Sequence, residues 1–201
     1  MTKEDPVNIP FWEDSYKDDS VSTFGTQPNA MILEFQDRFD PSWAVLDVGC
    51  GDGKNALYLA GLGFARVDAF DLSQNAIDKL HRLGAARNAR VNAWVQDLKQ
   101  FAFSKSYDLV MSFGTLHFVE RACWRDFLRA AKANTHPHGI HIIQLFTNRV
   151  PASPDIAPFA VGLANDGEIQ ALYEDWEILQ FKSYTFEDEH ASNKIVARKA
   201  E

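Results

Sequence analysis

The sequence contains little cysteine and no recognisable export signal. Only two of its 201 residues are cysteine, which is too few for a disulfide framework. Free thiols are typical of a reducing compartment, so we expect a cytoplasmic protein. Residues 1–10 are polar and acidic and lack the apolar centre of a signal peptide. We expect these ten residues to be disordered.

Long hydrophobic runs and an excess of positive charge are also missing. No apolar run approaches the length of a membrane span. The 20 basic and 28 acidic residues give a formal net charge of −8, which argues against nucleic acid and anionic membranes as partners. We therefore expect a small-molecule partner, no nucleic acid and no membrane. The length suits a single domain over residues 1–201, either a monomer or a homodimer.

The most informative stretch is a glycine-rich turn between an apolar run and an amphipathic helix. Residues 44–48 are typical of a strand buried on both faces, and residues 55–62 have helical spacing of small and apolar side chains. Glycines stand at alternate positions 49, 51 and 53 between them. Such a turn lets the backbone approach a ligand, while the free N–H groups of the following helix point at it.

Two kinds of nucleotide-binding protein use a turn of this type. The dinucleotide fingerprint G-x-G-x-x-G requires a third glycine where this chain has Lys54. The order Asp-x-Gly-x-Gly-x-Gly instead resembles the first motif of class I S-adenosylmethionine-dependent methyltransferases. The resemblance implies S-adenosylmethionine as the cofactor, with its methionine part inside the turn. It assigns to the cofactor Asp47, Gly49, Cys50, Gly51, Gly53 and Asn55.

A second acid follows the turn by about twenty residues. Residues 65–71 are typical of a strand that ends at Asp71, where a carboxylate can accept hydrogen bonds from ribose hydroxyls. Ser73 is the better N-cap for the next helix, which leaves Asp71 and the adjacent Leu72 for a ligand. NAD enzymes share this acid, so it supports a ribose-containing cofactor without choosing between the two classes. The glycine order makes that choice.

The rest of the chain continues the alternation of strands and helices. Five strands alternating with helices, followed by a terminal pair of strands, predict an α/β fold. It is a Rossmann-like, seven-stranded, mostly parallel sheet with helices on both faces and an antiparallel last strand, as the class I methyltransferase resemblance also implies. Besides those above, the expected strands are 90–95, 107–113, 140–146, 176–186 and 194–199, and the expected helices are 28–39, 73–84, 119–134 and 166–173.

The methyltransferase resemblance adds residues from two later strands. In that family an acid after the third strand receives the adenine amino group, and the next backbone N–H meets a ring nitrogen. These roles fall on Asp97 and Leu98, with a solvated loop acid as the alternative for Asp97. Ser112 and Phe113 end the fourth strand, where open α/β sheets bind their ligands.

An aromatic pair near the N-terminus has two interpretations. Trp12 and Tyr16 either pack a short helix onto the domain or belong to a lid over residues 11–27. Small-molecule methyltransferases carry a similar N-terminal W-x-x-x-Y segment, which folds over the cofactor and excludes water.

A second cover is expected after the fifth strand. Residues 147–165 contain three prolines and no helical or strand period, so we predict a functional loop that covers the substrate. Arg149 is its only basic residue and is a candidate for attracting an anionic substrate, although a solvated arginine is the alternative. Phe159 is a further candidate for contact with the substrate.

Within class I, the chain resembles the tellurite-resistance methyltransferase family over roughly residues 11–199. The resemblance includes three stretches outside the cofactor motifs, namely Pro158-Phe159-Ala160, Tyr173-Glu174-x-Trp176-Glu177 and Glu189-His190. In that family a histidine between the final strands faces the substrate beside an arginine. His190 matches the histidine, while the nearby basic residue is Lys194, which lacks a planar guanidinium. A tellurite, selenium or thiol-type acceptor is implied.

The implied reaction is displacement of the cofactor's methyl group by a substrate nucleophile, which requires alignment and a dry site rather than a nucleophilic side chain. A protonated oxygen or nitrogen acceptor would need a general base, and His117 and His190 are the candidates. The alternative for His117 is a partly buried histidine satisfied by the backbone. We expect no metal. Two other functions remain open, a nicotinamide-dependent oxidoreductase and a non-catalytic S-adenosylmethionine-binding protein.

Overall fold

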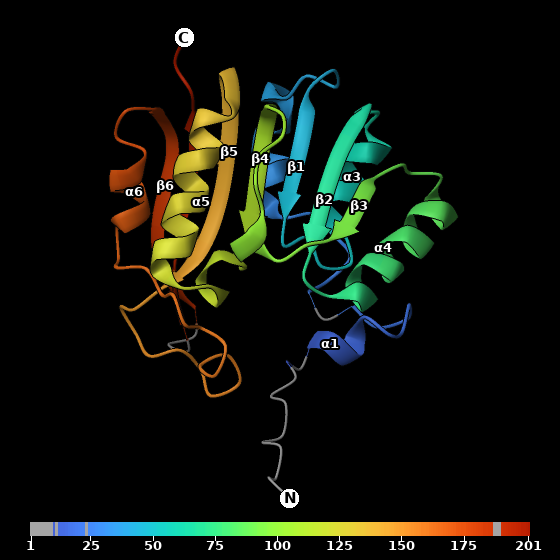
Figure 1. Cartoon of the computed structure of the whole chain (residues 1–201), viewed down its shortest axis with the longest axis horizontal. Helices are drawn as coiled ribbons and strands as arrows, with labels where there is room; N and C mark the ends of the chain where they lie inside the picture. Colours follow the sequence, from blue (N-terminus) through green and yellow to red (C-terminus); the bar gives the residue numbers. More distant parts are fainter. Residues whose placement is uncertain (1–9, 11, 23, 187–189) are drawn as a thin grey trace, which may run out of the picture.

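The computed structural model describes residues 10, 12–22, 24–186 and 190–201. In these residues seven strands form one sheet in the order β3-β2-β1-β4-β5-β7-β6 (Figure 1). The strands are β1 Ala44–Val48, β2 Arg66–Asp71, β3 Asn92–Val95, β4 Tyr107–Phe113, β5 Thr135–Thr147, β6 Glu177–Phe186 and β7 His190–Arg198. The α-helices are α1 Trp12–Ser15, α2 Ala30–Phe35, α3 Lys54–Gly61, α4 Gln74–Arg87, α5 Arg121–Ala133 and α6 Glu168–Leu172.

The pairing of the strands confirms the predicted fold. β1 runs parallel to β2 and β4, β3 pairs in parallel with β2, and β5 pairs in parallel with β4. β7 is antiparallel to both of its neighbours, β5 and β6. The chain therefore builds outward from β1 in one direction and then returns to build outward from β4 in the other. In an open α/β sheet, this reversal between β1 and β4 marks the place where ligands bind.

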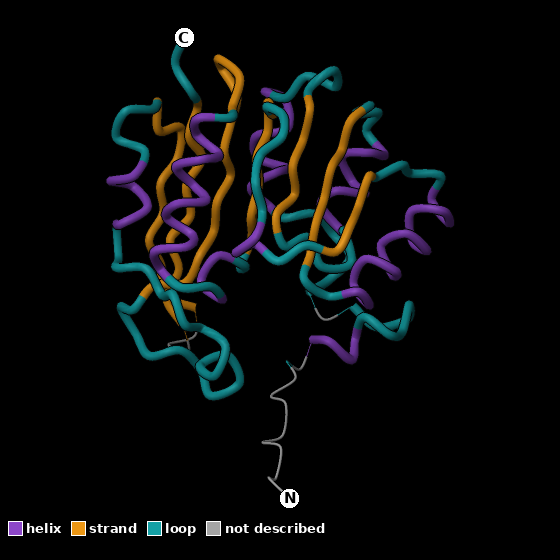
Figure 2. The backbone as a smooth tube through the Cα atoms, in the orientation of Figure 1, coloured by secondary structure: helices purple, strands orange, loops and turns teal. Residues whose placement is uncertain are grey.

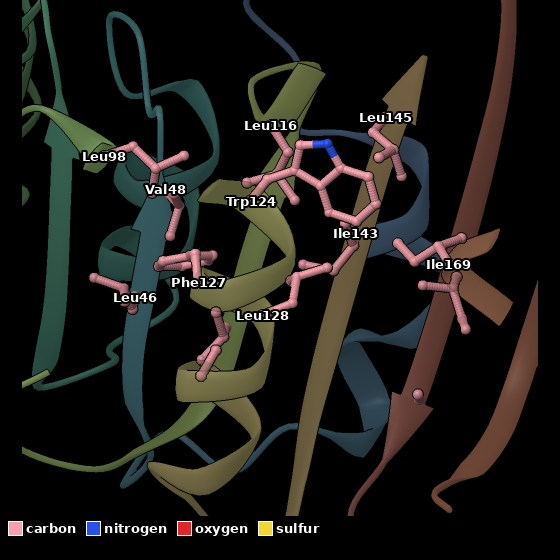
Figure 3. Close-up of a cluster of buried hydrophobic side chains, with 14 of the residues drawn as sticks. Leu46, Val48, Leu98, Leu116, Trp124, Phe127, Leu128, Ile143, Leu145 and Ile169 are labelled. Carbon is pink, nitrogen blue, oxygen red and sulfur yellow. The ribbon is translucent and has the colours of Figure 1, made fainter. Parts of the chain in front are cut away.

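Helices cover both faces of the sheet, as predicted. Side chains of α2, α3 and α4 pack on one face, among them Ile32, Leu59 and Leu80. On the other face Trp124 and Leu128 of α5 lie against side chains of β1 and β5, together with Ile169 of α6 (Figure 3). Fully burying one large apolar side chain contributes roughly 1.5–3 kcal/mol to the free energy of unfolding, so these two layers of helices stabilise the sheet. No helix in the described part of the chain is long and apolar enough to cross a membrane.

Several helix ends differ from the predicted ones. The helix expected from residue 28 begins at Ala30, because the Asn29 side chain caps it by accepting a hydrogen bond from the Met31 N–H. Its last turn is a 3-10 helix, Gln36–Arg38. The helix expected to end at Gly84 continues to Arg87, and Asn88, with φ of 52°, ends it instead.

The later elements are also shifted at their ends. α5 begins at Arg121 rather than 119, after a 3-10 turn at Leu116–Phe118. β5 begins at Thr135, so the turn expected at 137–139 is an irregular start of the strand, where His138 has φ of 64°. β7 begins at His190, four residues before the predicted start. Pairing with β5 and β6 along its whole length accounts for this extension.

The two expected covers lie at the same edge of the sheet. The long loop between β5 and α6 and the N-terminal helix α1 both lie at the edge where the parallel strands end (Figure 2). Thr147 and Ala164 bridge the two ends of the loop. Of the expected disordered residues 1–10, residues 1–9 lie outside the described part of the chain, as do residues 11 and 23 of the expected lid.

Candidate functional site

The glycine turn follows β1 beside the reversal of the sheet. Gly49 and Cys50 donate their N–H groups to the Phe70 carbonyl on β2, at 2.9 and 3.0 Å. Gly49, with φ of 65°, leaves no room for a side chain, because a Cβ there would stand 2.1 Å from Oγ1 of Thr115. Cys50 is buried, and burial together with nearby Asp71 raises the pKa of its thiol, which keeps it protonated. The turn is thus rigidly held between β2 and the loop after β4.

Two buried carboxylates flank this turn. Asp47 is 1% exposed, and its Oδ2 has no hydrogen-bond partner among the described residues. Burial and the neighbouring Asp71 raise the pKa of Asp47 to about 7. A buried carboxylate oxygen without a partner is costly, so this position suits a ligand that brings an ammonium or an N–H group.

The sequence led us to expect an Asp71 carboxylate without backbone partners. In the described structure it instead accepts two backbone hydrogen bonds. Its Oδ2 accepts the Gly51 N–H at 2.8 Å, and its Oδ1 accepts the Ser73 N–H at 3.0 Å. Ser73 nevertheless caps α4 as predicted, since its Oγ accepts the Ala76 N–H. Burial raises the pKa of Asp71, while the backbone N–H groups of Ser73 and Gly51 oppose that shift. Each carboxylate oxygen keeps a further lone pair for a ligand.

The N-terminal segment, defined here as residues 12–22, lies against the turn. Tyr16 is 5% exposed, and its hydroxyl occupies the space that a side chain on Gly51 would need. The ring of Trp12 lies 5.1 Å from that of Phe118 and 5.5 Å from that of Phe159. The segment therefore touches both the glycine turn and the long loop between β5 and α6.

The other residues assigned to a cofactor lie around the same edge of the sheet. Leu72 is 69% exposed, which leaves an apolar surface beside Asp71. Asp97 caps the 3-10 turn Leu98–Gln100 by accepting the Lys99 N–H at 2.9 Å, and Leu98 is buried. Ser112 is also buried, and its hydroxyl has no partner within the described ranges.

His117 and His190 are brought together around one phenylalanine. The ring of Phe146 lies 4.2 Å from that of His117 and 4.4 Å from that of His190. His117 is fully buried rather than partly buried, and the backbone satisfies only one of its ring nitrogens. Its Nδ1 accepts the Phe146 N–H at 3.2 Å, while its Nε2 has no partner among the described residues. Its proton is therefore on Nε2. Burial, and to a smaller extent His190, lowers the pKa of His117 to about 3.

These positions give the two histidines different chemical capacities. His117 is neutral and presents only an N–H donor at Nε2, because Nδ1 is used by the backbone. His190 is half-buried, and its Nδ1 has no partner in the residues that the structure describes. Of the two, His190 is the better placed to accept a proton.

The two basic residues that we expected near the substrate, Arg149 and Lys194, differ in their partners. Arg149 donates to Ser183 Oγ at 2.8 Å and to Thr185 Oγ1, and lies 3.5 Å from Asp166. Lys194 pairs with no carboxylate in the described residues, and its ammonium lies 4.7 Å from the centre of the Tyr184 ring. Lys194 is thus the cation left available for an anion.

Two residues, Gln144 and Lys79, were missed by the sequence prediction. Gln144 is the register partner of Lys194 and donates to the Tyr184 hydroxyl at 3.2 Å. Lys79 reaches the glycine turn from α4. Its place three residues after Ala76, within an apolar helical stripe, was a usable signal. Among the described residues no three His, Cys, Asp or Glu side chains form a group that could hold a metal.

Solved structures share this architecture. TehB from Haemophilus influenzae matches with a TM-score of 0.72 at 23% identity, covering 94% of this chain and 66% of that one. A magnesium protoporphyrin IX methyltransferase from Synechocystis PCC 6803, solved with bound S-adenosylmethionine, matches with a TM-score of 0.64 at 16% identity over 86% and 77% of the two chains. The strand order and the glycine turn define the class I methyltransferase fold.

Sequence comparison identifies the family. The family model of the tellurite resistance protein TehB matches residues 16–196, and the chain belongs to that family. A probable S-adenosyl-L-methionine-dependent methyltransferase TehB of Haemophilus influenzae (strain KW20 / Rd) is 30% identical over 139 residues, which are 68% of this chain and 47% of the relative. A ubiquinone biosynthesis O-methyltransferase of Rickettsia bellii is 32% identical over 49% of this chain and 40% of its own. The chain thus spans about half the length of these curated relatives.

Proposed function

We propose that this chain is an S-adenosylmethionine-dependent methyltransferase that acts on a small molecule. The observation that carries the proposal is the buried Oδ2 of Asp47, which lacks a partner in the described residues and stands beside a glycine turn that opens a helix. An amino-acid ammonium group would satisfy that oxygen. The TehB family membership and the class I fold support the same cofactor.

The residues present fit this cofactor along its whole length. Asp47 would hold the ammonium, and the turn from Gly49 to Gly53, with Cys50 and Asn55, would surround the methionine part. Asp71 would accept hydrogen bonds from the ribose hydroxyls through its remaining lone pairs.

The adenine end of the cofactor would meet a second group of residues. Leu72, Asp97 and Leu98 would contact the adenine, and Ser112 and Phe113 would line the wall at the end of β4. When bound, S-adenosylmethionine supplies an electrophilic methyl group on a sulfonium.

The covers would act by excluding water. Tyr16 closes the space over Gly51, and the contact between Trp12 and Phe159 joins the N-terminal segment to the 147–165 loop. A dry site favours methyl transfer, because a desolvated nucleophile and the sulfonium attract each other more strongly.

The acceptor would lie near His190 and Lys194. The proposed acceptor is a tellurite, selenium or thiol-type nucleophile, for which Lys194 supplies an ammonium that has no ion pair in the described residues. Such soft nucleophiles need little help from a base, and His190 would take the proton where one must leave. Arg149 already bonds to two β6 side chains and would therefore have a smaller part.

The alternatives predict different binding. The fingerprint of a nicotinamide enzyme requires a glycine at the position of Lys54, so this alternative predicts NAD binding that the sequence does not favour. The Lys54 ammonium donates to the Phe24 carbonyl. A non-catalytic binding protein would have the same cofactor residues. The monomeric or dimeric state and the cytoplasmic location stay predictions.

The test is a calorimetric titration with S-adenosylmethionine, S-adenosylhomocysteine and NAD, followed by activity assays. We expect the first two to bind in the micromolar range and NAD not to bind. Tellurite, selenite and small thiols are then assayed as acceptors, with His190→Ala as the variant. That variant should lose turnover and keep its affinity for S-adenosylhomocysteine. Binding of NAD alone would reject the proposal, and binding without transfer to any acceptor would favour the non-catalytic alternative.

A further inference from the structure

Lys79 is a buried lysine whose ammonium has a full set of partners. Its side chain is 2% exposed. The Nζ donates to the Val21 carbonyl at 2.6 Å and to the Ser15 carbonyl at 3.0 Å, and lies 3.2 Å from Oδ2 of Asp52. An ammonium has three N–H donors, so this group is satisfied only while all three oxygens surround it.

The three partners belong to two different parts of the chain. Ser15 and Val21 lie in the N-terminal segment, whereas Asp52 lies inside the glycine turn between Gly51 and Gly53. One nitrogen atom therefore ties the backbone of the segment to the turn. Ser15 also immediately precedes Tyr16, whose hydroxyl lies over Gly51. The hydrogen bond from Lys79 to the Ser15 carbonyl therefore helps to hold Tyr16 against the turn.

We propose that Lys79 is a positioning residue that holds the N-terminal segment closed over the cofactor at the glycine turn. The inference rests on the binding of S-adenosylmethionine at this turn, as proposed above. Lifting the segment breaks two hydrogen bonds from the charged ammonium to backbone carbonyls, and hydrogen bonds from an ionised donor are stronger than those between neutral groups. Lys79 thereby favours the closed segment and slows the departure of the cofactor, while methyl transfer in the closed state does not depend on it.

A surface ion pair offers a matched control. Arg82, also on α4, forms a bidentate interaction with Asp19 of the same segment, in which Nε donates to Oδ2 and Nη2 donates to Oδ1. Both side chains are 47% exposed, and the pair does not reach the turn. Exposed ion pairs of this kind contribute little to stability. Arg82→Gln therefore removes a link between the same two elements at small cost, and it leaves the glycine turn unchanged.

The experiment compares Lys79→Met and Arg82→Gln with the wild-type chain. Stopped-flow fluorescence gives the dissociation rate of S-adenosylhomocysteine, and steady-state assays give kcat and the KM for S-adenosylmethionine. For Lys79→Met we expect dissociation and KM to rise by about tenfold or more, with kcat unchanged. For Arg82→Gln we expect changes below about twofold. Proteolytic cleavage within residues 12–22 should be faster in Lys79→Met only.

Two results would overturn the inference. One is a folded Lys79→Met variant with wild-type dissociation and KM. The other is a variant that loses thermal stability alone, since this would make Lys79 structural. If Lys79→Met does not fold, Asp52→Asn replaces it, because this change keeps both carbonyl bonds and weakens only the link to the turn; unchanged dissociation would again overturn the inference. A wild-type chain that binds neither cofactor form rejects the proposed function itself.

Discussion

The hydroxyl of Tyr16 lies 2.9 Å from the point where a Cβ on Gly51 would stand. This close approach joins residues that are 35 positions apart and brings the N-terminal segment onto the glycine turn. Gly51 also has φ of 54°, which L side chains rarely adopt. Burial, followed by the charge of Asp71, raises the pKa of Tyr16, so its hydroxyl stays neutral there.

Gly51→Ala should therefore weaken cofactor binding. The new methyl group pushes against Tyr16, and the left-handed backbone adds a strain of about 1–2 kcal/mol. We expect the Kd for S-adenosylmethionine to rise about tenfold or more, measured by calorimetry. Gly63→Ala is the control, because Gly63 has φ of 92° and nothing within 4 Å of an added Cβ. Equal effects of the two substitutions on the Kd would contradict a role for the Tyr16 contact.

Binding of S-adenosylmethionine should depend on the protonation of Asp47. The raised pKa, from 3.8 to about 7, means that the free protein holds a proton there below neutral pH, whereas an ammonium ligand requires the carboxylate. Affinity should fall as the pH falls through that value, by about tenfold between about pH 8 and about pH 6. Calorimetry at several pH values measures this, and Asp47→Asn should bind weakly with a flat profile. A flat wild-type profile would separate Asp47 from the ammonium.

The raised pKa of Asp47 gives the stability of the free protein the opposite pH dependence to that of cofactor binding. A carboxyl whose folded pKa is raised stabilises the fold while protonated, and this contribution is lost as the pH rises through about 7. Saturating S-adenosylmethionine should therefore raise the Tm more at about pH 8 than at about pH 6.

Tyr173→Phe should destabilise the fold by about 1–3 kcal/mol. His141 is fully buried, with its Nε2 2.8 Å from Thr135 Oγ1 and its Nδ1 2.6 Å from the Tyr173 hydroxyl. Thr135 donates to the Ala131 carbonyl, so His141 donates from Nε2 and its Nδ1 accepts from Tyr173. The substitution leaves that acceptor unsatisfied. Urea denaturation measures the change, and Tyr58→Phe, on a less buried hydroxyl, should cost less; equal losses would contradict this assignment.

Acid should destabilise the protein through two buried histidines. Burial lowers the pKa of His117 and of His141 from 6.5 to about 3. In the unfolded chain these histidines take up a proton near their ordinary pKa of 6.5, whereas in the folded chain they stay neutral until about pH 3. Their contribution to stability is therefore fully present above about pH 6.5 and is lost as the pH falls toward the folded pKa. Two such groups give a slope of up to about 2.7 kcal/mol per pH unit. Asp47 opposes this slope over the same pH range, so the test is urea denaturation of the Asp47→Asn variant at about pH 7, 6 and 5. A free energy of unfolding that stays constant in this variant would reject the prediction.

Lys194→Met should impair anionic acceptors selectively. Because Lys194 has no carboxylate partner in the described residues and Arg149 bonds to Ser183 and Thr185, we expect the KM for tellurite or selenite to rise about tenfold in the first variant. For Arg149→Met the change should stay below about twofold. A neutral thiol serves as the control acceptor. An equal loss for the thiol would mean that Lys194 acts on the shape of the site rather than on charge.

The sequence predicted the sheet well, because local patterns encode it. β4 begins and ends as predicted, at Tyr107 and Phe113, since an aromatic-acid pair opens an apolar run there. Asp108 of this pair accepts the Ala44 N–H and so ties the start of β4 to the start of β1. The TehB family and the class I fold were both confirmed, whereas the role of each site residue stays a prediction.

Other features depend on contacts between distant segments and could not be predicted. The apolar helical stripe around Lys79 was a usable signal that this lysine is buried, but nothing local indicated that three oxygens from two segments would surround its ammonium. Gly84 was wrongly predicted to end its helix. Within α4 a Cβ at this position would stand 2.9 Å from the Ala89 carbonyl oxygen and 3.3 Å from Leu57, so glycine is there for packing. The hydrogen bonds of Arg149 likewise depend on the place of β6.

The position of β7 between β5 and β6 has a consequence for protein synthesis. β6 leaves the ribosome before β7, yet β7 is its only neighbour in the described sheet. A nascent chain that stops before residue 190 carries two strands with unpaired hydrogen-bonding edges, which favour pairing with other chains. Chaperone demand should therefore be high in the interval after β6 has emerged and before β7 has, and stop codons placed between the codons of these two strands should produce aggregates rather than a working protein.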